Sequence, residues 1–176
     1  MSEQQTDLQD TIGSLREAIQ RINRTSRTRF KKTFEEVSAN FSENFPRLFG
    51  GGKASLELIE EEDVLEAGID IMARPPGKRL QNVNLLSGGE KTMTALALLV
   101  ALFQVRQSPF FLLDEVDAAL DDANVGRFNG LIAELAKSSQ FLVITHNKRT
   151  IEVADVLYGV TMEKKGVSKL VGVELS

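Results

Sequence analysis

The feature that most constrains the fold is the apolar run Phe-Phe-Leu-Leu at residues 110–113, which ends directly in Asp114 and Glu115. Such a run, without polar alternation, is typical of a strand that is buried on both faces. A second run of this kind lies at residues 141–144, and the segment 124–136 between them has apolar residues at helical spacing. Buried strands that alternate with helices predict an α/β fold, with a mostly parallel sheet covered on both faces.

The other elements after residue 54 are predicted from the same kinds of pattern. We expect short strands at 55–59 and 68–73, a helix at 87–106, a short helix at 149–155, and a terminal hairpin of 156–162 and 167–174. Residues 74–79 are rich in proline and glycine, and they predict a connecting loop.

The residues before 50 predict one long helix. Its first apolar residues follow the a/d spacing of a coiled coil: Leu8, Ile12, Leu15, Ile19 and Ile22. A wider stripe follows, typical of a helix packed on a globular body: Phe30, Phe34, Val37, Phe41 and Phe45. We expect a coiled-coil arm at 1–49 that runs into a head at 50–176, with Pro46 and the glycines 50–52 ending the helix. The alternative is an amphipathic helix docked wholly on the chain's own core.

Composition limits the class of protein. The chain has 176 residues, 42% of them hydrophobic and 26% charged, which is typical of one globular domain. It has no cysteine, which suits a reducing cytosol, and its polar start shows no secretory signal. The longest apolar run, 95–103, is shorter than the roughly 20 residues that span a bilayer, so we expect no membrane partner.

The net charge of −4 means that any contact with nucleic acid must come from a local basic patch. One dense patch is present, where the arm is expected to meet the head: Arg21, Arg24, Arg27, Arg29, Lys31 and Lys32. It could contact DNA phosphates without regard to base sequence, or it could be the solvated face of a long helix.

A Ser-Gly-Gly turn opens the helix expected at 87–106. Ser87 is a good N-cap, and Glu90 three residues later completes a capping box. The box leaves Gly88 and Gly89 unexplained, because each glycine in a first helical turn costs about 1 kcal/mol relative to alanine. Without side chains, the turn exposes amide N–H groups and the positive end of the helix dipole, which suits a phosphate.

Asp114 and Glu115 directly follow a predicted strand. In parallel α/β sheets, ligands bind beyond the carboxyl ends of the strands. Asp114 is placed to hold Mg²⁺, directly or through water, and Glu115 to orient and deprotonate a water that attacks a γ-phosphate. The plainer alternative is a pair of acids that merely caps the next helix.

His146 is the only histidine, and it follows the second buried run at what should be the same sheet edge. Spacing alone leaves open whether it contacts a phosphate or the attacking water, or is structural. The stretch 117–121 after the carboxylates is, by itself, an acidic loop that opens into a helix.

No P-loop, Gly-x-x-x-x-Gly-Lys followed by Ser or Thr, lies in the sequence. In the two nearest candidates, Lys53 is followed by Ala54 and Lys78 by Arg79. A chain with hydrolytic carboxylates but without the main phosphate-binding loop should be inactive alone, and should need a partner that supplies that loop.

The order of these segments resembles the ABC-type ATPases. Residues 86–91 resemble the ABC signature, 110–115 the Walker B strand, 117–121 the D-loop and 145–147 the switch-histidine loop. The longer stretches 75–91 and 114–121 resemble the C-terminal half-head of bacterial structural maintenance of chromosomes (SMC) proteins, and the resemblance covers nearly the whole chain.

This resemblance implies ATP and Mg²⁺ as cofactors, with Asp114 serving the metal and with Glu115 and His146 as catalytic residues. It implies that six residues bind the nucleotide: Leu86, Ser87, Gly88, Gly89, Glu90 and Asp117. Implied partners are an N-terminal half-head of the same protein that carries the P-loop, a second SMC head joined through ATP, a kleisin subunit and DNA. The implied role is chromosome condensation and segregation in the cytoplasm, at the nucleoid.

Two alternatives to this function remain open. Split-head DNA repair ATPases of the zinc-hook or RecN type share the divided head. The chain could also act as a non-enzymatic module that binds kleisin or DNA.

Overall fold

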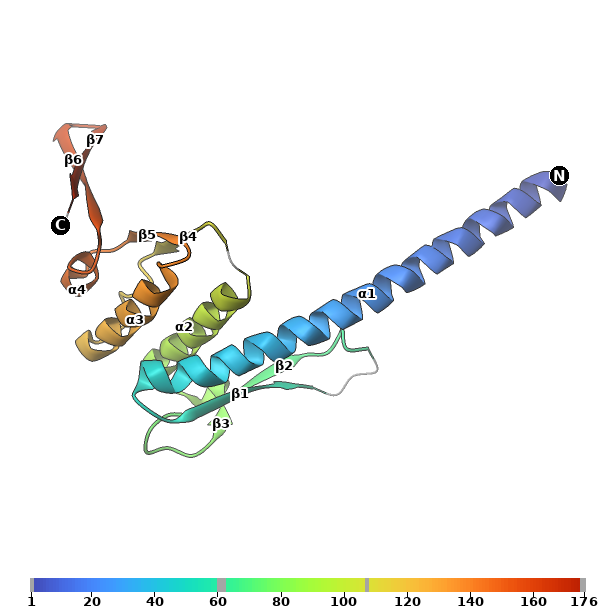
Figure 1. Ribbon diagram of the computed structural model, residues 1–176, viewed down its shortest axis with the longest axis horizontal. Coiled ribbons are helices and arrows are strands. Elements are labelled where there is room, and N and C mark those ends of the chain that lie inside the picture. Colours follow the sequence, from blue (N-terminus) through green and yellow to red (C-terminus); the bar gives the residue numbers. More distant parts are fainter. Residues whose placement is uncertain (1, 60–62, 107, 175–176) are drawn as a thin grey trace.

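The structure, a computed structural model, describes residues 2–59, 63–106 and 108–174 (Figure 1). Its helices are α1 (Ser2–Phe49), α2 (Gly88–Val105), α3 (Asp122–Leu135) and α4 (Lys148–Ile151), with a 3-10 turn at Val83–Leu85. Its strands are β1 (Lys53–Leu58), β2 (Ile69–Arg74), β3 (Gln81–Asn82), β4 (Phe110–Asp114), β5 (Gln140–Ile144), β6 (Val156–Lys164) and β7 (Val167–Glu174). The expected mixed α/β fold is confirmed, and only β3 and the 3-10 turn had no counterpart in the predictions.

Helix α1 serves as an arm at one end and as part of the core at the other. Its N-terminal part projects far from the body (Figure 1), and its seam residues from Ile12 to Ile22 are exposed. From Val37 onward one face of the helix is buried, with Phe41, Phe45 and Leu48 fully enclosed. The alternative of a helix docked along its whole length on the chain's own core is therefore wrong for the exposed half. None of the described residues covers the apolar seam there.

The prediction that Pro46 ends the arm helix is wrong, because α1 continues to Phe49. A proline this close to the end removes only one intrahelical hydrogen bond, and aromatic packing holds the last turn in place. The ring of Phe49 stacks on that of Phe45 at a centroid distance of 4.2 Å. The helix stops at Gly50, whose φ of 71° is left-handed, and the N–H of Gly51 donates to the carbonyl of Pro46 at 2.8 Å.

The parallel sheet is smaller than the sequence predicts. Only β4 and β5 pair in parallel among the described strands, while β1–β2–β3 and β6–β7 form antiparallel sheets. The first of these sheets lies along α1, which in turn packs side by side with α2 (Figure 1).

The expectation that β4 and β5 are buried on both faces is also wrong. On one face, Phe111 stacks with Phe141 and packs on Phe103 of α2, at centroid distances of 5.0 and 4.0 Å. On the other face Phe110 and Leu112 of β4 are 65% and 59% exposed, and Leu142 and Ile144 of β5 are similarly open. The described residues supply helices for one face only, so four large apolar side chains lie bare.

The terminal hairpin β6–β7 extends away from the body at the end opposite the arm (Figure 1). Exposed apolar side chains alternate along β6 and occur without strict alternation along β7: Val156, Tyr158, Val160, Met162, Val167, Leu170, Val171 and Val173. The hairpin is therefore a second large apolar surface of this chain. None of the described helices is long and apolar enough to cross a membrane.

Candidate functional site

The carboxyl ends of β4 and β5 bring two chain segments together. The strands run in register, with Asp114 opposite Ile144, so the residues that follow them leave from the same sheet edge. The N–H of Glu115 continues the ladder by donating to the carbonyl of Ile144 at 2.9 Å. Glu115 has φ 47°, the only positive φ at a non-glycine residue among those described, and it turns the chain sharply just after the strand.

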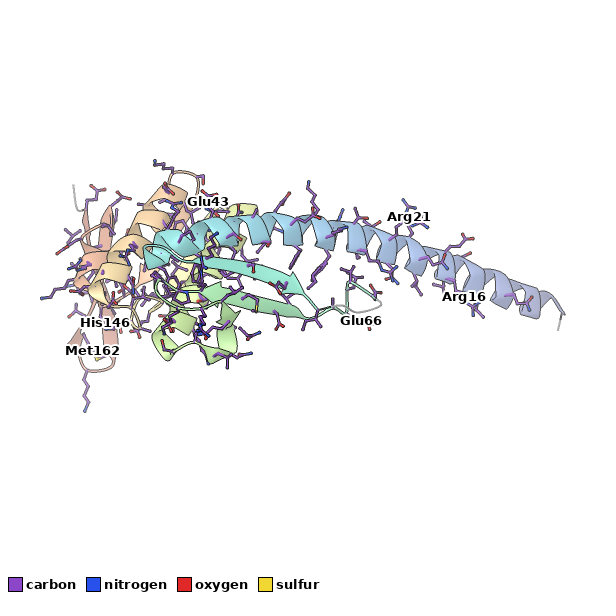
Figure 2. The ribbon with its side chains drawn as sticks, turned by 90° about the horizontal axis from the view of Figure 1, so that it is seen from below. Arg16, Arg21, Glu43, Glu66, His146 and Met162 are labelled. Carbon is purple, nitrogen blue, oxygen red and sulfur yellow. The ribbon has the colours of Figure 1, made fainter. Side chains whose placement is uncertain are left out.

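Glu115 and His146 face each other across this edge. The Oε1 atom of Glu115 lies 3.6 Å from Nδ1 of His146, and the two side chains are 60% and 75% exposed. Figure 2 shows His146 at the end of the molecule opposite the arm residues Arg16 and Arg21. A carboxylate and an imidazole at this spacing, both open to solvent, can share a water or contact the same ligand.

The Asp114 carboxylate is exposed at the end of β4, and none of the described residues forms a hydrogen bond or ion pair with it. No cluster of three or more acidic or histidine side chains suited to a metal ion occurs in the described part of the chain. The donor set therefore fits Mg²⁺ only in the form that uses one or two carboxylates plus phosphate oxygens and water.

The side chain of Asp117 is buried in this structure and is hydrogen-bonded within the chain. It is 1% exposed, and its Oδ2 atom accepts hydrogen bonds from the hydroxyls of Thr145 at 2.7 Å and Thr150 at 2.5 Å. The nucleotide-binding role that the resemblance implies for Asp117 stays a prediction, and in this structure two donors from within the chain occupy its carboxylate.

The predicted capping box at the start of α2 is present. The Oε2 atom of Glu90 accepts from the N–H of Ser87 at 3.1 Å and from its hydroxyl at 2.7 Å. Lys78 from the preceding loop lies 2.9 Å from the same carboxylate. The Lys78 ammonium and the Ser87 hydroxyl hold the pKa of Glu90 below its ordinary value.

Packing against the described residues does not explain why positions 88 and 89 are glycines. A Cβ built on either residue meets no described atom within 4 Å, and neither residue has a positive φ. No described residue therefore excludes a side chain at the first turn of α2. Leu86, by contrast, is buried beneath this turn, and the Glu90 carboxylate is engaged within the chain. These two side chains therefore stabilise the turn, and in this structure they do not point into solvent as free ligand-binding groups.

The structure does not join the turn at Ser87 to the carboxylates at the end of β4. None of the described residues of one group forms a hydrogen bond or ion pair with the other. A ligand that contacts Ser87, Gly88 and Gly89 therefore does not need to be the one that contacts Glu115.

Two of the six residues of the basic patch form ion pairs with acidic side chains of this chain. Arg27 forms two hydrogen bonds to Asp63 in the β1–β2 loop, at 3.0 and 2.6 Å, and Lys32 lies 3.8 Å from Glu36. The four remaining residues, Arg21, Arg24, Arg29 and Lys31, form no ion pair with a described acidic side chain. Figure 2 shows this loop, marked by Glu66, reaching the arm below Arg21.

Sequence reasoning missed several residues around the site. Thr150 and Arg149 lie in the segment after β5, and Arg149 donates to the carbonyl of Asp122 at 3.2 Å. Lys78 lies in what we read only as a connecting loop. No pattern in the sequence marks them, because each acts across a long sequence separation that only the fold closes.

Residues 4–169 match the protein family described as RecF/RecN/SMC N terminal domain. The chain is 58% identical to the chromosome partition protein Smc of Myxococcus xanthus and 49% identical to that of Bacillus subtilis, in each case over 175 residues and 99% of this chain. It spans about 15% of the length of these relatives.

Solved structures of similar sequence share the fold. A Smc head domain with an extended coiled coil from Pyrococcus furiosus, bound to the C-terminal domain of ScpA, has a TM-score of 0.79 and 45% identity, over 92% of this chain and 40% of that one. The SMC head domain from Thermotoga maritima has a TM-score of 0.64 and 44% identity, over 86% of this chain and 52% of that one.

A third solved chain, from work on ATP-driven dimerization and DNA stimulated activation of SMC ATPases, has a TM-score of 0.75 and 44% identity, over 84% of this chain and 89% of that one. Family, relatives and solved structures agree with the fold and with the exposed helical arm. The chain therefore belongs to the RecF/RecN/SMC N terminal domain family, and within that family to the SMC ATPase heads.

Proposed function

We propose that this chain is the C-terminal half of the ATPase head of a bacterial Smc protein, with residues 1–49 as its coiled-coil arm and 50–176 as the half-head. It hydrolyses ATP only when an N-terminal half-head of the same protein supplies the P-loop. The sequence contains no P-loop of its own, and the bacterial Smc relatives are about seven times longer than this chain.

The observation that carries this proposal is the pair Gly88 and Gly89. Two glycines in a helical first turn cost about 2 kcal/mol together relative to alanine, and no contact with the described residues requires them. A group outside the chain must therefore need the close approach that they permit. Exposed amide N–H groups at a helix start favour an anion, so we assign this position to the phosphates of ATP held by a second head.

The bare face of β4 and β5 supports a missing half. Phe110, Leu112, Leu142 and Ile144 form an exposed apolar surface of the kind that a partner layer covers in α/β proteins. The N-terminal half-head is the partner that we propose there, and its arrival would bring a P-loop beside Asp114 and Glu115.

In the completed site, each residue at the sheet edge has a separate role. Glu115 orients and deprotonates the attacking water, His146 contacts the γ-phosphate or that water, and Asp114 serves Mg²⁺. When bound, the metal would neutralise charge on the phosphates. The 3.6 Å spacing of Glu115 and His146 and the exposure of Asp114 fit these roles.

The partners that we propose follow from the family and the remaining surfaces. One solved relative is a Smc head bound to ScpA, so we assign a kleisin-type partner to this half-head, with the β6–β7 hairpin among its candidate docking elements. DNA would contact the unpaired basic residues Arg21, Arg24, Arg29 and Lys31 on the arm. The biological role is then chromosome condensation and segregation at the nucleoid.

The alternatives have less support. The relatives are chromosome partition proteins, which argues against a zinc-hook or RecN-type repair ATPase. A purely non-enzymatic binding module would not need the two glycines or the Glu115–His146 pair.

Complex formation tests the proposal. This chain is co-expressed with an N-terminal half-head that carries the P-loop, and the pair is followed by size-exclusion chromatography. We expect a stable complex of one copy of each that binds ATP. A matched variant, Leu112→Glu, places a charge on the bare face and should abolish the complex. Failure of the unchanged chain to associate with the N-terminal half would overturn the half-head assignment.

A further inference from the structure

We infer that Asp117 is a positioning residue, which, through the hydroxyls of Thr145 and Thr150, holds the segment after β4 against the segment after β5 and so sets the Glu115–His146 spacing. This inference rests on the proposed ATPase function, and it gives Asp117 a different role from nucleotide contact. It also assigns a role to Thr150, which has none in the proposal above.

Asp117 forms a buried hydrogen-bond network with two threonines. Its carboxylate is buried, and both threonine hydroxyls donate to the same oxygen, Oδ2, at 2.7 and 2.5 Å. Thr145 also accepts a hydrogen bond from the N–H of Asn147 at 2.9 Å. Separation of the two segments would leave the buried carboxylate short of hydrogen-bond donors, which costs folding free energy. The hydrogen bonds therefore hold the two segments together.

The contact lies close in sequence to each of the two reacting groups. Asp117 follows Glu115 by two positions, and Thr145 directly precedes His146. The hydrogen bond between Asp117 and Thr145 therefore fixes the chain on either side of the 3.6 Å gap between the carboxylate and the imidazole. Glu115 and His146 themselves are open to solvent, so no packing of their own side chains fixes this spacing.

Further contacts hold the same two segments together. The guanidinium of Arg149 donates to the carbonyl of Asp122 at 3.2 Å, and Asn129 of α3 donates to the carbonyl of Arg149 at 3.1 Å. Thr150 is thus placed between the Asp117 carboxylate and the start of α3, with 7% of its surface exposed. Its hydroxyl is the part of α4 that reaches the acidic loop.

The sheet offers a matched control at its opposite edge. The hydroxyl of Ser139 donates to the carbonyl of Ser108 at 2.7 Å, and so it ties the segments that precede β5 and β4. Loss of this hydroxyl removes a comparable cross-link from the same two strands, far from Glu115 and His146. Ser139→Ala therefore reports the purely structural effect of losing such a tie.

The test uses the reconstituted two-half head with ATP. Thr150→Val keeps the shape of the side chain but removes its hydroxyl, and we expect kcat to fall about 10-fold with the KM for ATP unchanged. Thr150→Ser should restore most of kcat, and Ser139→Ala should leave kcat as it is. Unchanged kcat in Thr150→Val, or an equal loss in Ser139→Ala, would overturn the inference.

A double-mutant cycle separates positioning from stability. If Thr150 acts through the Glu115–His146 pair, Thr150→Val should lower kcat much less in a His146→Ala background than in the unchanged head. Equal losses in both backgrounds would contradict the inference. Hydrogen exchange of the same reconstituted head gives a readout without turnover: Thr150→Val should raise exchange in residues 114–121 and 145–150 together, and independent behaviour of the two segments would count against it.

The outcomes for the proposed function are distinct from these. If the unchanged two-half head forms but has no ATP turnover, the proposed ATPase function fails, and the inference about catalysis fails with it. If turnover is normal and only the Thr150 effects are missing, the ATPase function stands and the positioning role is wrong.

Discussion

The Nδ1 atom of His146 lies 3.6 Å from the Oε1 atom of Glu115, although the two residues belong to segments that follow different strands. Their meeting depends on the parallel register of β4 and β5, which places Asp114 opposite Ile144. The proximity gives the proposed general base a neighbour that can share its water or contact the same phosphate.

Glu115→Gln should slow ATP hydrolysis by the reconstituted heads about 100-fold or more, because the amide cannot take the proton from the attacking water. ATP-driven pairing of the heads should persist, since the change leaves the turn at Ser87 intact. Single-turnover hydrolysis and analytical ultracentrifugation measure the two effects. Glu57→Gln, on β1, is the matched control, and unchanged turnover in Glu115→Gln would remove Glu115 from the role of base.

Ser87→Arg should abolish ATP-driven pairing of heads and leave nucleotide binding at the P-loop unchanged. The arginine adds bulk only where we expect the phosphates of a second head to approach. Loss of the N-cap alone costs about 1 kcal/mol, so Ser87→Ala serves as the control that should still pair. Pairing by Ser87→Arg in ATP would refute the assignment of this turn to the second head's nucleotide.

Gly52→Ala should destabilise the head by about 2 kcal/mol or more. Gly52 has a φ of 89°, and a Cβ there would lie 2.4 Å from the backbone carbonyl oxygen of Arg74. Gly77→Ala is the comparison, because its φ of 75° is also left-handed but its Cβ meets nothing within 4 Å. Thermal unfolding should show a clearly larger loss for Gly52→Ala, and equal losses would mean that the clash is relieved by movement of β2.

The capping contact of Glu90 should make stability depend on pH in the acid range. Because Lys78 and Ser87 lower its folded pKa, Glu90 adds stability above its unfolded pKa of about 4.3, and this stability is lost as the pH falls through the folded pKa. Lys78→Met should weaken the head at pH 7 and make little difference once the pH is below the folded pKa. Chemical unfolding of both proteins at several pH values measures this, and a difference that persists undiminished in acid would contradict it.

Much of the fold could be predicted because local patterns determine it. The arm, the buried half of α1 and helices α2 and α3 follow from apolar periodicity. The end of α1 follows from the glycines at 50–52, which adopt positive φ values that other residues rarely adopt. The helix continues past Pro46 because a proline there removes only one intrahelical hydrogen bond, while the stacked rings of Phe45 and Phe49 stabilise the last turn. The sequence of β4 is indeed that of a doubly buried strand, but within this chain one face of it lies bare.

The site was predictable in part for similar reasons. Glu115, His146 and Asp114 follow apolar strands, so their common edge could be expected from the parallel pairing. The burial of Asp117 could not, because its partner Thr150 lies 33 positions away in the sequence and no local pattern pairs the two residues. The ion pair of Arg27 with Asp63 likewise depends on how far the β1–β2 loop reaches along the arm.

ATP hydrolysis is divided between two half-heads, one that carries the P-loop and this one, which carries the carboxylates. ATP turnover is measured for this chain alone, for an N-terminal half-head with the P-loop alone, and for their mixture. The account predicts turnover only in the mixture, with a steep dependence on protein concentration as heads pair. Turnover by this chain alone would contradict it, because the chain would then hold a phosphate site of its own.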